Sequence, residues 1–146
     1  MADATVGITI ARPIEEVFAV LTDVEKTGTW FPGNVEEHWT SPPPHGVGST
    51  RHAVVTVMGR RQENDATVTE YDPPHRGVMS GEGQGVSWTA ALDFAPDGDG
   101  TRVEIAFDFS ATGPMRLFIG LFLRWYRGQW VRGLATLKRM METGEL

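Results

Sequence analysis

The sequence contains no cysteine, and this absence removes several kinds of site. Disulfide bonds, zinc sites built on thiolates and a cysteine nucleophile are all excluded. A chain without disulfides fits a reducing compartment, so we expect a cytoplasmic protein. Residues 1–13 also lack the positively charged region and the apolar region that together form a secretory signal.

Basic residues are scarce as well. The 146-residue chain has 13 Lys and Arg against 19 Asp and Glu, which gives a net charge of −6. Phosphate contacts need a concentrated basic face, so this balance argues against nucleic-acid binding. The most apolar run, residues 117–123, is far shorter than the roughly 20 residues that cross a bilayer. We therefore predict one domain over residues 1–146 that is not an integral membrane protein.

Strand patterns dominate the middle of the chain. The predicted strands cover residues 34–40, 48–58, 61–71, 75–81, 85–95 and 101–112, and Gly, Pro and Asp form turn signals between them. A further strand at 5–11 precedes two short helices, at 13–21 and 23–30. Strands 85–95 and 101–112 alternate apolar and polar residues, so one face of the sheet is expected to be covered and the other wet.

The hairpin around Gly59-Arg60 decides which polar side chains face inward. With these two residues as the turn, the predicted pairs are Met58 with Arg61, Val57 with Gln62, Val55 with Asn64 and Ala53 with Ala66. Paired residues share a face, so Arg51, Gln62 and Asn64 then point inward with the apolar residues. A slip of one residue would reverse the faces and turn inward His52, Thr56, Glu63 and Thr67 instead.

Residues 113–146 predict a long helix with one apolar stripe. A long helix in a small domain must bury that stripe, and the predicted strands offer the partner. We therefore expect a curved sheet closed by this helix, with a space between them. The residues of the stripe are Ile119, Leu123, Trp130, Leu134, Leu137 and Met141.

The order and motifs of these segments resemble the START-like, helix-grip (SRPBCC) superfamily. Within it, the chain is similar to polyketide cyclase/dehydrase and lipid-transport-like proteins. The segments that carry the resemblance are 8–18, 30–32, 47–49, 68–74, 100–103 and 134–142. The resemblance implies an α+β fold in which a seven-stranded curved antiparallel sheet wraps around the long C-terminal helix, with two short helices after the first strand. It also implies an apolar cavity that takes a small hydrophobic molecule.

Polar residues on the inner face are the candidates for orienting such a ligand. The Arg51 guanidinium suits a carboxylate or a carbonyl, and a buried Tyr126 hydroxyl needs a polar partner that a ligand can supply. The candidate ligand-binding residues are Arg51, Val55, Gln62, Asn64, Trp88, Phe107, Ile119, Leu123, Tyr126 and Trp130.

Each candidate also has a purely structural interpretation. The helix residues would then be ordinary core, and Arg51 would face solvent or pair with a structural acid such as Glu36. Three functions therefore stay open. The first is a carrier of a lipid-like or polyketide-like molecule, and the second is a cofactor-independent cyclase or dehydratase that uses Arg51, Tyr126 and His52. The third is a protein-interaction module that works through the apolar helix surface.

The histidines give weak signals. His45 and His75 lie in Pro-rich turns and are expected in solvent, whereas His38 and His52 lie on strands. No spacing resembles a metal site, and the nearest approach is the pair of His38 with Glu36. We therefore predict no metal and no other cofactor.

Residues 115–128 are too apolar for a helix that buries one face. Residues 117–123 are apolar all round, and Trp125 is expected on the outward side. Such a segment either covers itself in a kinked first turn or meets a partner. We expect self-capping or a homodimer in preference to contact with a membrane.

Overall fold

One antiparallel sheet and one long helix make up most of the protein. The structure is a computed structural model that describes residues 2–33, 35–57, 59–83 and 85–146. In those ranges the strands are β1 (Ala2–Ile10), β2 (Val35–Trp39), β3 (Thr50–Val57), β4 (Arg60–Asp72), β5 (Arg76–Gly83), β6 (Val86–Asp97) and β7 (Gly100–Ala111). The helices are α1 (Ile14–Thr22), α2 (Thr27–Trp30), α3 (Ile119–Glu142) and the 3-10 helices η1 (Val24–Lys26) and η2 (Gly113–Leu117).

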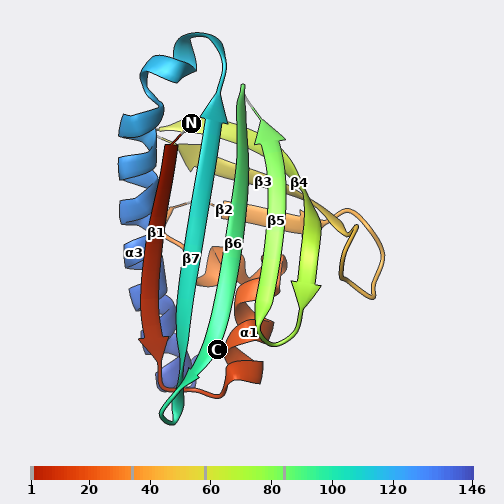
Figure 1. The fold of residues 1–146 in the computed structure, drawn as a ribbon, viewed down its shortest axis with the longest axis vertical. Coiled ribbons are helices and arrows are strands. Elements are labelled where there is room, and N and C mark those ends of the chain that lie inside the picture. The colour runs from red at the N-terminus through yellow and green to blue at the C-terminus, as the bar shows by residue number, and fades with distance from the viewer. Residues whose placement is uncertain (1, 34, 58, 84) are drawn as a thin grey trace.

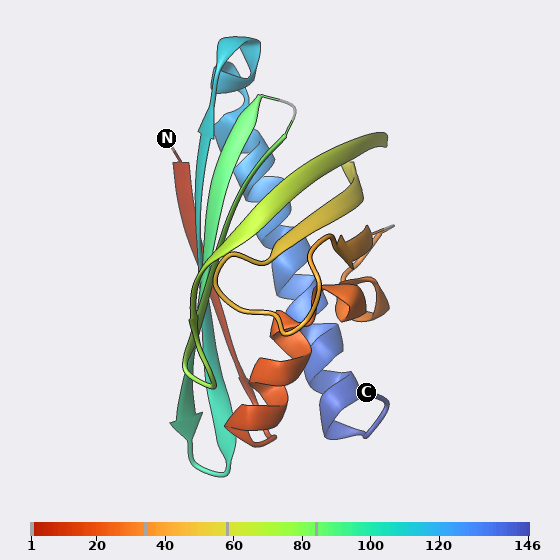
Figure 2. The same ribbon diagram turned by 90° about the vertical axis from the view of Figure 1, so that its right-hand side faces the viewer.

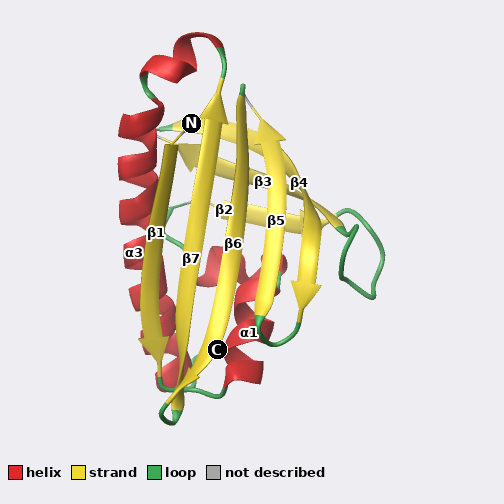
Figure 3. Cartoon of the chain, in the orientation of Figure 1, coloured by secondary structure: helices red, strands yellow, loops and turns green. Residues whose placement is uncertain are grey.

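The seven strands lie in the order β1-β7-β6-β5-β4-β3-β2, so the first two strands of the chain form opposite edges of the sheet (Figure 1). The connection between them contains α1, η1 and α2. All helices lie on the same side of the sheet, and β3 and β4 curl toward that side (Figure 2). Among the described residues, helix occurs only in the segment after β1 and the segment after β7 (Figure 3). The predicted α+β helix-grip fold is confirmed.

The short helices begin where local chemistry favours them. Helix α1 begins directly after Pro13, with Glu15 and Glu16 in its first turn near the positive end of the helix dipole. The Asp23 side chain accepts a hydrogen bond of 3.2 Å from the backbone N–H of Glu25 and so caps the start of η1. These caps fix the path by which the chain crosses from one edge of the sheet to the other.

The alternating strands bury the face that the sequence predicted. In β7, Val103, Ile105, Phe107 and Phe109 are at most 4% exposed, and the polar residues between them face outward. The paired strand β6 places Trp88 opposite Phe109 and Ala90 opposite Phe107. Small and large side chains therefore alternate across the inner face, which leaves room between the sheet and the helix.

The predicted register of the β3–β4 hairpin is wrong by two residues, but the predicted faces are right. Val55 pairs with Gln62 and Ala53 with Asn64, because the strands end at Val57 and resume at Arg60. A shift of two residues preserves the face of every side chain, since the pleat has a period of two. The predicted pair of Met58 with Arg61 lies outside the described residues, as does Asn34 of the predicted strand 34–40.

The end of the chain contains two helices instead of one. Helix η2 stops at Leu117, and α3 starts at Ile119 and continues through Gly120 and Gly128. Leu117, Phe118 and Leu121 are 84%, 56% and 63% exposed, so the predicted self-capping is wrong. The homodimer through residues 115–128 stays a prediction. None of the helices in the described ranges has both the length and the apolar character that a membrane span requires.

Two glycines of α3 have different surroundings and so give a matched test of the packing between α2 and α3. A Cβ at Gly133 would lie 3.2 to 3.3 Å from Trp30, Phe31 and Pro32, whereas one at Gly128 would meet no heavy atom within 4 Å. We expect Gly128→Ala to raise the free energy of unfolding by about 0.5–1 kcal/mol. Gly133→Ala should lack this gain because it crowds α2. Urea unfolding measures both, and equal gains would contradict the close contact.

Candidate functional site

Two adjoining cavities lie between the sheet and α3. The first has a volume of about 560 Å³ and extends from α1 and η1 to the β2–β3 loop, and the second has about 340 Å³ and extends toward the β3–β4 hairpin. Six residues line both cavities, and we call them the waist. They are Thr27, Glu37, Arg51, Trp88, Tyr126 and Trp130.

The walls on either side of the waist are mainly apolar. The first cavity is lined by residues such as Leu21, Val68, Val78, Leu92 and Phe107, and the second by Val55, Val86, Phe109, Phe122 and Trp125. At the rim of the first cavity, the Trp39 and His45 rings stack with their centroids 4.0 Å apart. The combination of apolar walls and a few polar groups is typical of sites for small hydrophobic molecules.

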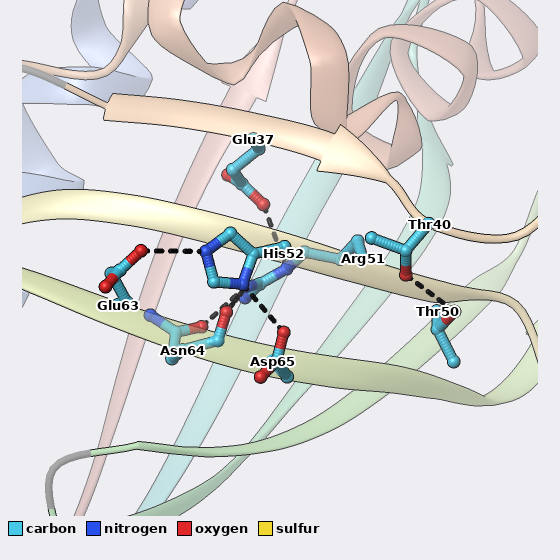
Figure 4. Close-up of polar contacts among 8 residues, drawn as sticks. All are labelled: Glu37, Thr40, Thr50, Arg51, His52, Glu63, Asn64 and Asp65. Carbon is cyan, nitrogen blue, oxygen red and sulfur yellow. Dashed lines mark hydrogen bonds and ion pairs between the residues drawn. The ribbon is translucent and has the colours of Figure 1, made fainter.

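A buried ion pair crosses the waist. Arg51 Nε lies 3.0 Å from Glu37 Oε2, and the two side chains are only 7% and 12% exposed. Arg51 Nη1 donates to Asn64 Oδ1 at 2.5 Å, and the guanidinium lies 5.2 Å from the centroid of the Trp88 ring. Figure 4 shows Glu37 on β2 and Arg51 on β3 pointing toward each other. The neighbouring strands bring them together because β2 pairs with β3 and both side chains share the inner face.

Burial shifts the pKa of the groups at the waist. The pKa of Glu37 is raised mainly because burial disfavours the carboxylate, and the charge of Arg51 and the hydroxyl of Thr27 oppose the shift. Burial likewise lowers the pKa of Arg51 against the opposing effect of Glu37. Burial also raises the pKa of Tyr126, so its phenol is protonated at neutral pH and acts as a hydrogen-bond donor.

Several buried polar atoms around the cavities have no hydrogen-bond partner. In the described part of the chain they are Trp30 Nε1, Arg51 Nε, Gln62 Oε1 and Trp130 Nε1, and each belongs to a residue that lines a cavity. Arg51 Nε is close to Glu37, but the angle is not that of a hydrogen bond. Trp130 Nε1 is close enough to Tyr126 to oppose its pKa shift without a well-aligned bond. Buried polar groups are otherwise almost always paired, so these atoms mark where a ligand or water would bind.

A protein-family model described as "Polyketide cyclase / dehydrase and lipid transport" matches residues 1–142. The chain belongs to the polyketide cyclase/dehydrase and lipid transport family. A comparison with curated protein sequences found no match.

Solved structures share the START-like fold of this family member. A protein from Thermus thermophilus is similar with a TM-score of 0.80 and 20% identity, over 99% of this chain and 100% of the other. A START superfamily protein from Mycobacterium smegmatis has a TM-score of 0.82 and 13% identity, over 95% and 98%. The di-domain ARO/CYC protein BexL has a TM-score of 0.76 and 19% identity, over 97% of this chain and 47% of BexL. At these identities the likeness shows the fold alone.

Eight of the ten predicted ligand-binding residues lie in the cavity walls of this family member. Four are at the waist (Arg51, Trp88, Tyr126 and Trp130), one is in the first cavity (Phe107) and three are in the second (Val55, Gln62 and Asn64). Ile119 and Leu123 do not line either cavity. They pack with the core at the start of α3, where the helix lies against the sheet.

His52 lies on the opposite face of the sheet from the cavities. Its Nδ1 is 2.7 Å from Asp65 and its Nε2 is 3.2 Å from Glu63, and these two carboxylates raise its pKa (Figure 4). In the observed hairpin His52 points outward, away from the cavities, so its position does not support the predicted catalytic role. The described residues contain no group of three or more metal-ligating side chains.

Sequence reasoning missed three features of the site. The acid that pairs with Arg51 is Glu37 and not Glu36, and Trp125 lines the second cavity although it was expected on the outside. The signal for Glu37 was its alternation with Val35 and Trp39, which places all three on one face of β2. His45, expected in solvent, is half-buried at the rim of the first cavity.

Removal of one partner tests the ion pair. We expect Arg51→Met to lower the free energy of unfolding by about 3–5 kcal/mol, because it leaves the Glu37 carboxylate buried without a counter-charge. Arg61→Met, an exposed position on the neighbouring strand, should change it by less than about 0.5 kcal/mol. A small loss at Arg51 would contradict a buried charge pair.

The loss of unfolding free energy in Arg51→Met should increase as the pH rises. The folded-state pKa of Glu37 is already raised, and removal of Arg51 takes away the attraction that holds it down. A carboxyl group whose pKa is higher in the folded than in the unfolded protein stabilises the fold fully below its unfolded-state pKa. This stability is lost as the pH rises through its folded-state pKa. Urea unfolding should therefore show a larger deficit at about pH 7 than at about pH 5. Equal deficits would show that Glu37 is not the group left uncompensated.

Proposed function

We propose that the protein binds a small hydrophobic molecule across the two cavities, with a hydrogen-bond acceptor of that molecule at the waist. The observation that carries the proposal is the set of unpaired polar atoms in apolar walls. Trp130 Nε1 is a donor at the waist that is buried without an aligned acceptor, and Arg51 Nε has the Glu37 carboxylate 3.0 Å away but not in hydrogen-bond geometry. A ligand oxygen at the waist would supply an aligned acceptor, and the apolar walls would hold the rest of the molecule.

The size of the space supports a ligand of moderate size. Cavities of about 560 and 340 Å³ that meet at one waist fall within the range of drug-sized and lipid-sized ligand sites. The similarity to a START superfamily protein and the family's description are consistent with a carrier role. No described group of side chains calls for a metal, and the proposed binding needs no cofactor.

A cyclase-type activity is the second candidate, and one observation favours it. Arg51 and Tyr126, two of the predicted catalytic residues, both line the waist, and Glu37 lines it too with a raised pKa. A carboxylate with a raised pKa suits proton abstraction next to a ketone, while the cation stabilises the enolate oxygen. Glu37 would thus take the role that was predicted for His52. The ARO/CYC description of BexL belongs to that protein, whose fold this chain shares.

A matched pair of probes tests the acceptor site. Fluorenone and fluorene differ by one carbonyl, so the difference in their affinities measures the interaction with the waist. We expect Trp130→Phe to weaken fluorenone binding by about 5- to 10-fold, as loss of one hydrogen bond of about 1–1.5 kcal/mol requires, and to leave fluorene unchanged. Trp125→Phe, in the wall of the second cavity, should change both affinities by the same factor, because this wall holds the apolar part of either probe.

Equal losses for both probes would refute the acceptor site and reduce Trp130 to a packing residue. If native mass spectrometry detects no bound probe at all, the carrier proposal fails. The interaction-module hypothesis would then lead, since Leu117, Phe118 and Leu121 remain exposed.

Hydrogen exchange separates the carrier from the cyclase. Undecyl methyl ketone exchanges its α-hydrogens slowly in deuterated buffer, and a base at the waist would accelerate this step by about 10²–10⁴-fold. We expect binding without acceleration, measured by mass spectrometry of the recovered ketone. Acceleration that is lost in Glu37→Gln but kept in Glu36→Gln would contradict the carrier role and favour the cyclase.

A further inference from the structure

We propose that Glu37 makes the waist selective for uncharged carbonyl compounds and against hydrophobic anions such as fatty carboxylates. The inference rests on the proposed function, because it specifies the chemical class of the ligand. A cavity with one buried arginine would by itself suggest a carboxylate ligand. Here that arginine already has a counter-ion, Glu37, whose carboxylate is 3.0 Å away.

The charges around the cavities support this selection. Arg51 is the one Lys or Arg among the described residues that line either cavity. The acidic residues that line them are Asp23, Glu25, Glu37 and Glu63. Asp23 and Glu25 lie in η1 and at its cap, beside the first cavity, whereas the Glu63 carboxylate contacts His52 on the opposite face of the sheet. An anion in the first cavity would therefore lie near negative charge and meet a cation that is already neutralised.

The donors at the waist favour a neutral acceptor. Arg51 Nη1 is occupied by the side chain and the carbonyl of Asn64, and its guanidinium lies over Trp88. The donors at the waist without an aligned acceptor include Arg51 Nε, whose neighbouring oxygen is that of Glu37, and the neutral indole N–H of Trp130. A ketone, quinone or ester oxygen accepts from such donors and adds no charge. A carboxylate would bring a second negative charge against Glu37 in a site where water does not screen it.

Replacement of Glu37 should therefore change which ligands bind. Laurate and undecyl methyl ketone carry the same undecyl chain and differ in the charge of the head group. We expect wild-type protein to bind the ketone at least tenfold more tightly than laurate in calorimetric titration near neutral pH. In Glu37→Gln, the freed charge of Arg51 should attract laurate and lower this ratio at least tenfold.

Glu36→Gln is the matched control. Glu36 is the neighbour of Glu37 on β2, but it is exposed on the other face, and its replacement makes the same change in net charge. We expect the wild-type ratio in this variant. An equal shift in both variants would mean that overall charge, and not the waist, sets the preference, and would overturn the inference.

A second variant protects the test against a failure of Glu37→Gln to fold. Glu37→Gln combined with Arg51→Gln removes both charges and leaves no buried ion, so it should still prefer the ketone. If wild-type protein binds both compounds equally, if a folded Glu37→Gln keeps the wild-type ratio, or if the double variant prefers laurate, the inference is wrong while the binding proposal stands. If wild-type protein binds neither compound and also fails to bind fluorenone, the binding proposal itself has failed.

Discussion

The buried ion pair between Glu37 and Arg51 is the interaction on which the interior of this protein depends. Removal of two charges from water is costly, and their attraction compensates only when further polar contacts complete the geometry. Asn64 and the ring of Trp88 supply those contacts for Arg51. The pair also needs the sheet to curl, because β2 and β3 must lie over α3 for both side chains to be buried (Figure 2). A core that serves only stability would need neither the buried charges nor the polar contacts that complete them.

The waist divides what would otherwise be one apolar interior. Small residues on the sheet leave space there, and Gly81 shows how tightly the space is shaped, since a Cβ at this position would lie 2.5 Å from the Trp88 ring. Each unpaired buried donor costs stability, by about 1–3 kcal/mol for a lost hydrogen bond. A fold that keeps such donors beside two cavities is better suited to binding than to maximal stability. This trade-off is the physical basis for assigning function to the waist instead of to the more regular second half of α3.

The sequence was sufficient for the fold and for most of the cavity wall. Alternation in β6 and β7, the cap at Asp23 and the stripe of α3 all depend on local rules, and the structure follows them. The inward position of Arg51 was also predicted, because a register error of two residues leaves every side chain on the same face of the sheet. The partner of Arg51 was not predicted, since the choice between Glu36 and Glu37 depends on how β2 joins the sheet edge. The start of α3 was also missed, because a separate 3-10 helix ends at Leu117 before α3 begins, and Trp125 lines the second cavity.

The central claim is that the two unpaired donors at the waist receive an acceptor from a bound hydrophobic molecule. The most direct measurement is a titration of nitrogen-labelled protein with fluorenone, followed through the side-chain N–H resonances of Arg51 and Trp130. We expect both resonances to shift together as fluorenone binds, while the indole resonance of Trp125 shifts much less. Saturable binding that leaves the Arg51 and Trp130 resonances in place would contradict the claim.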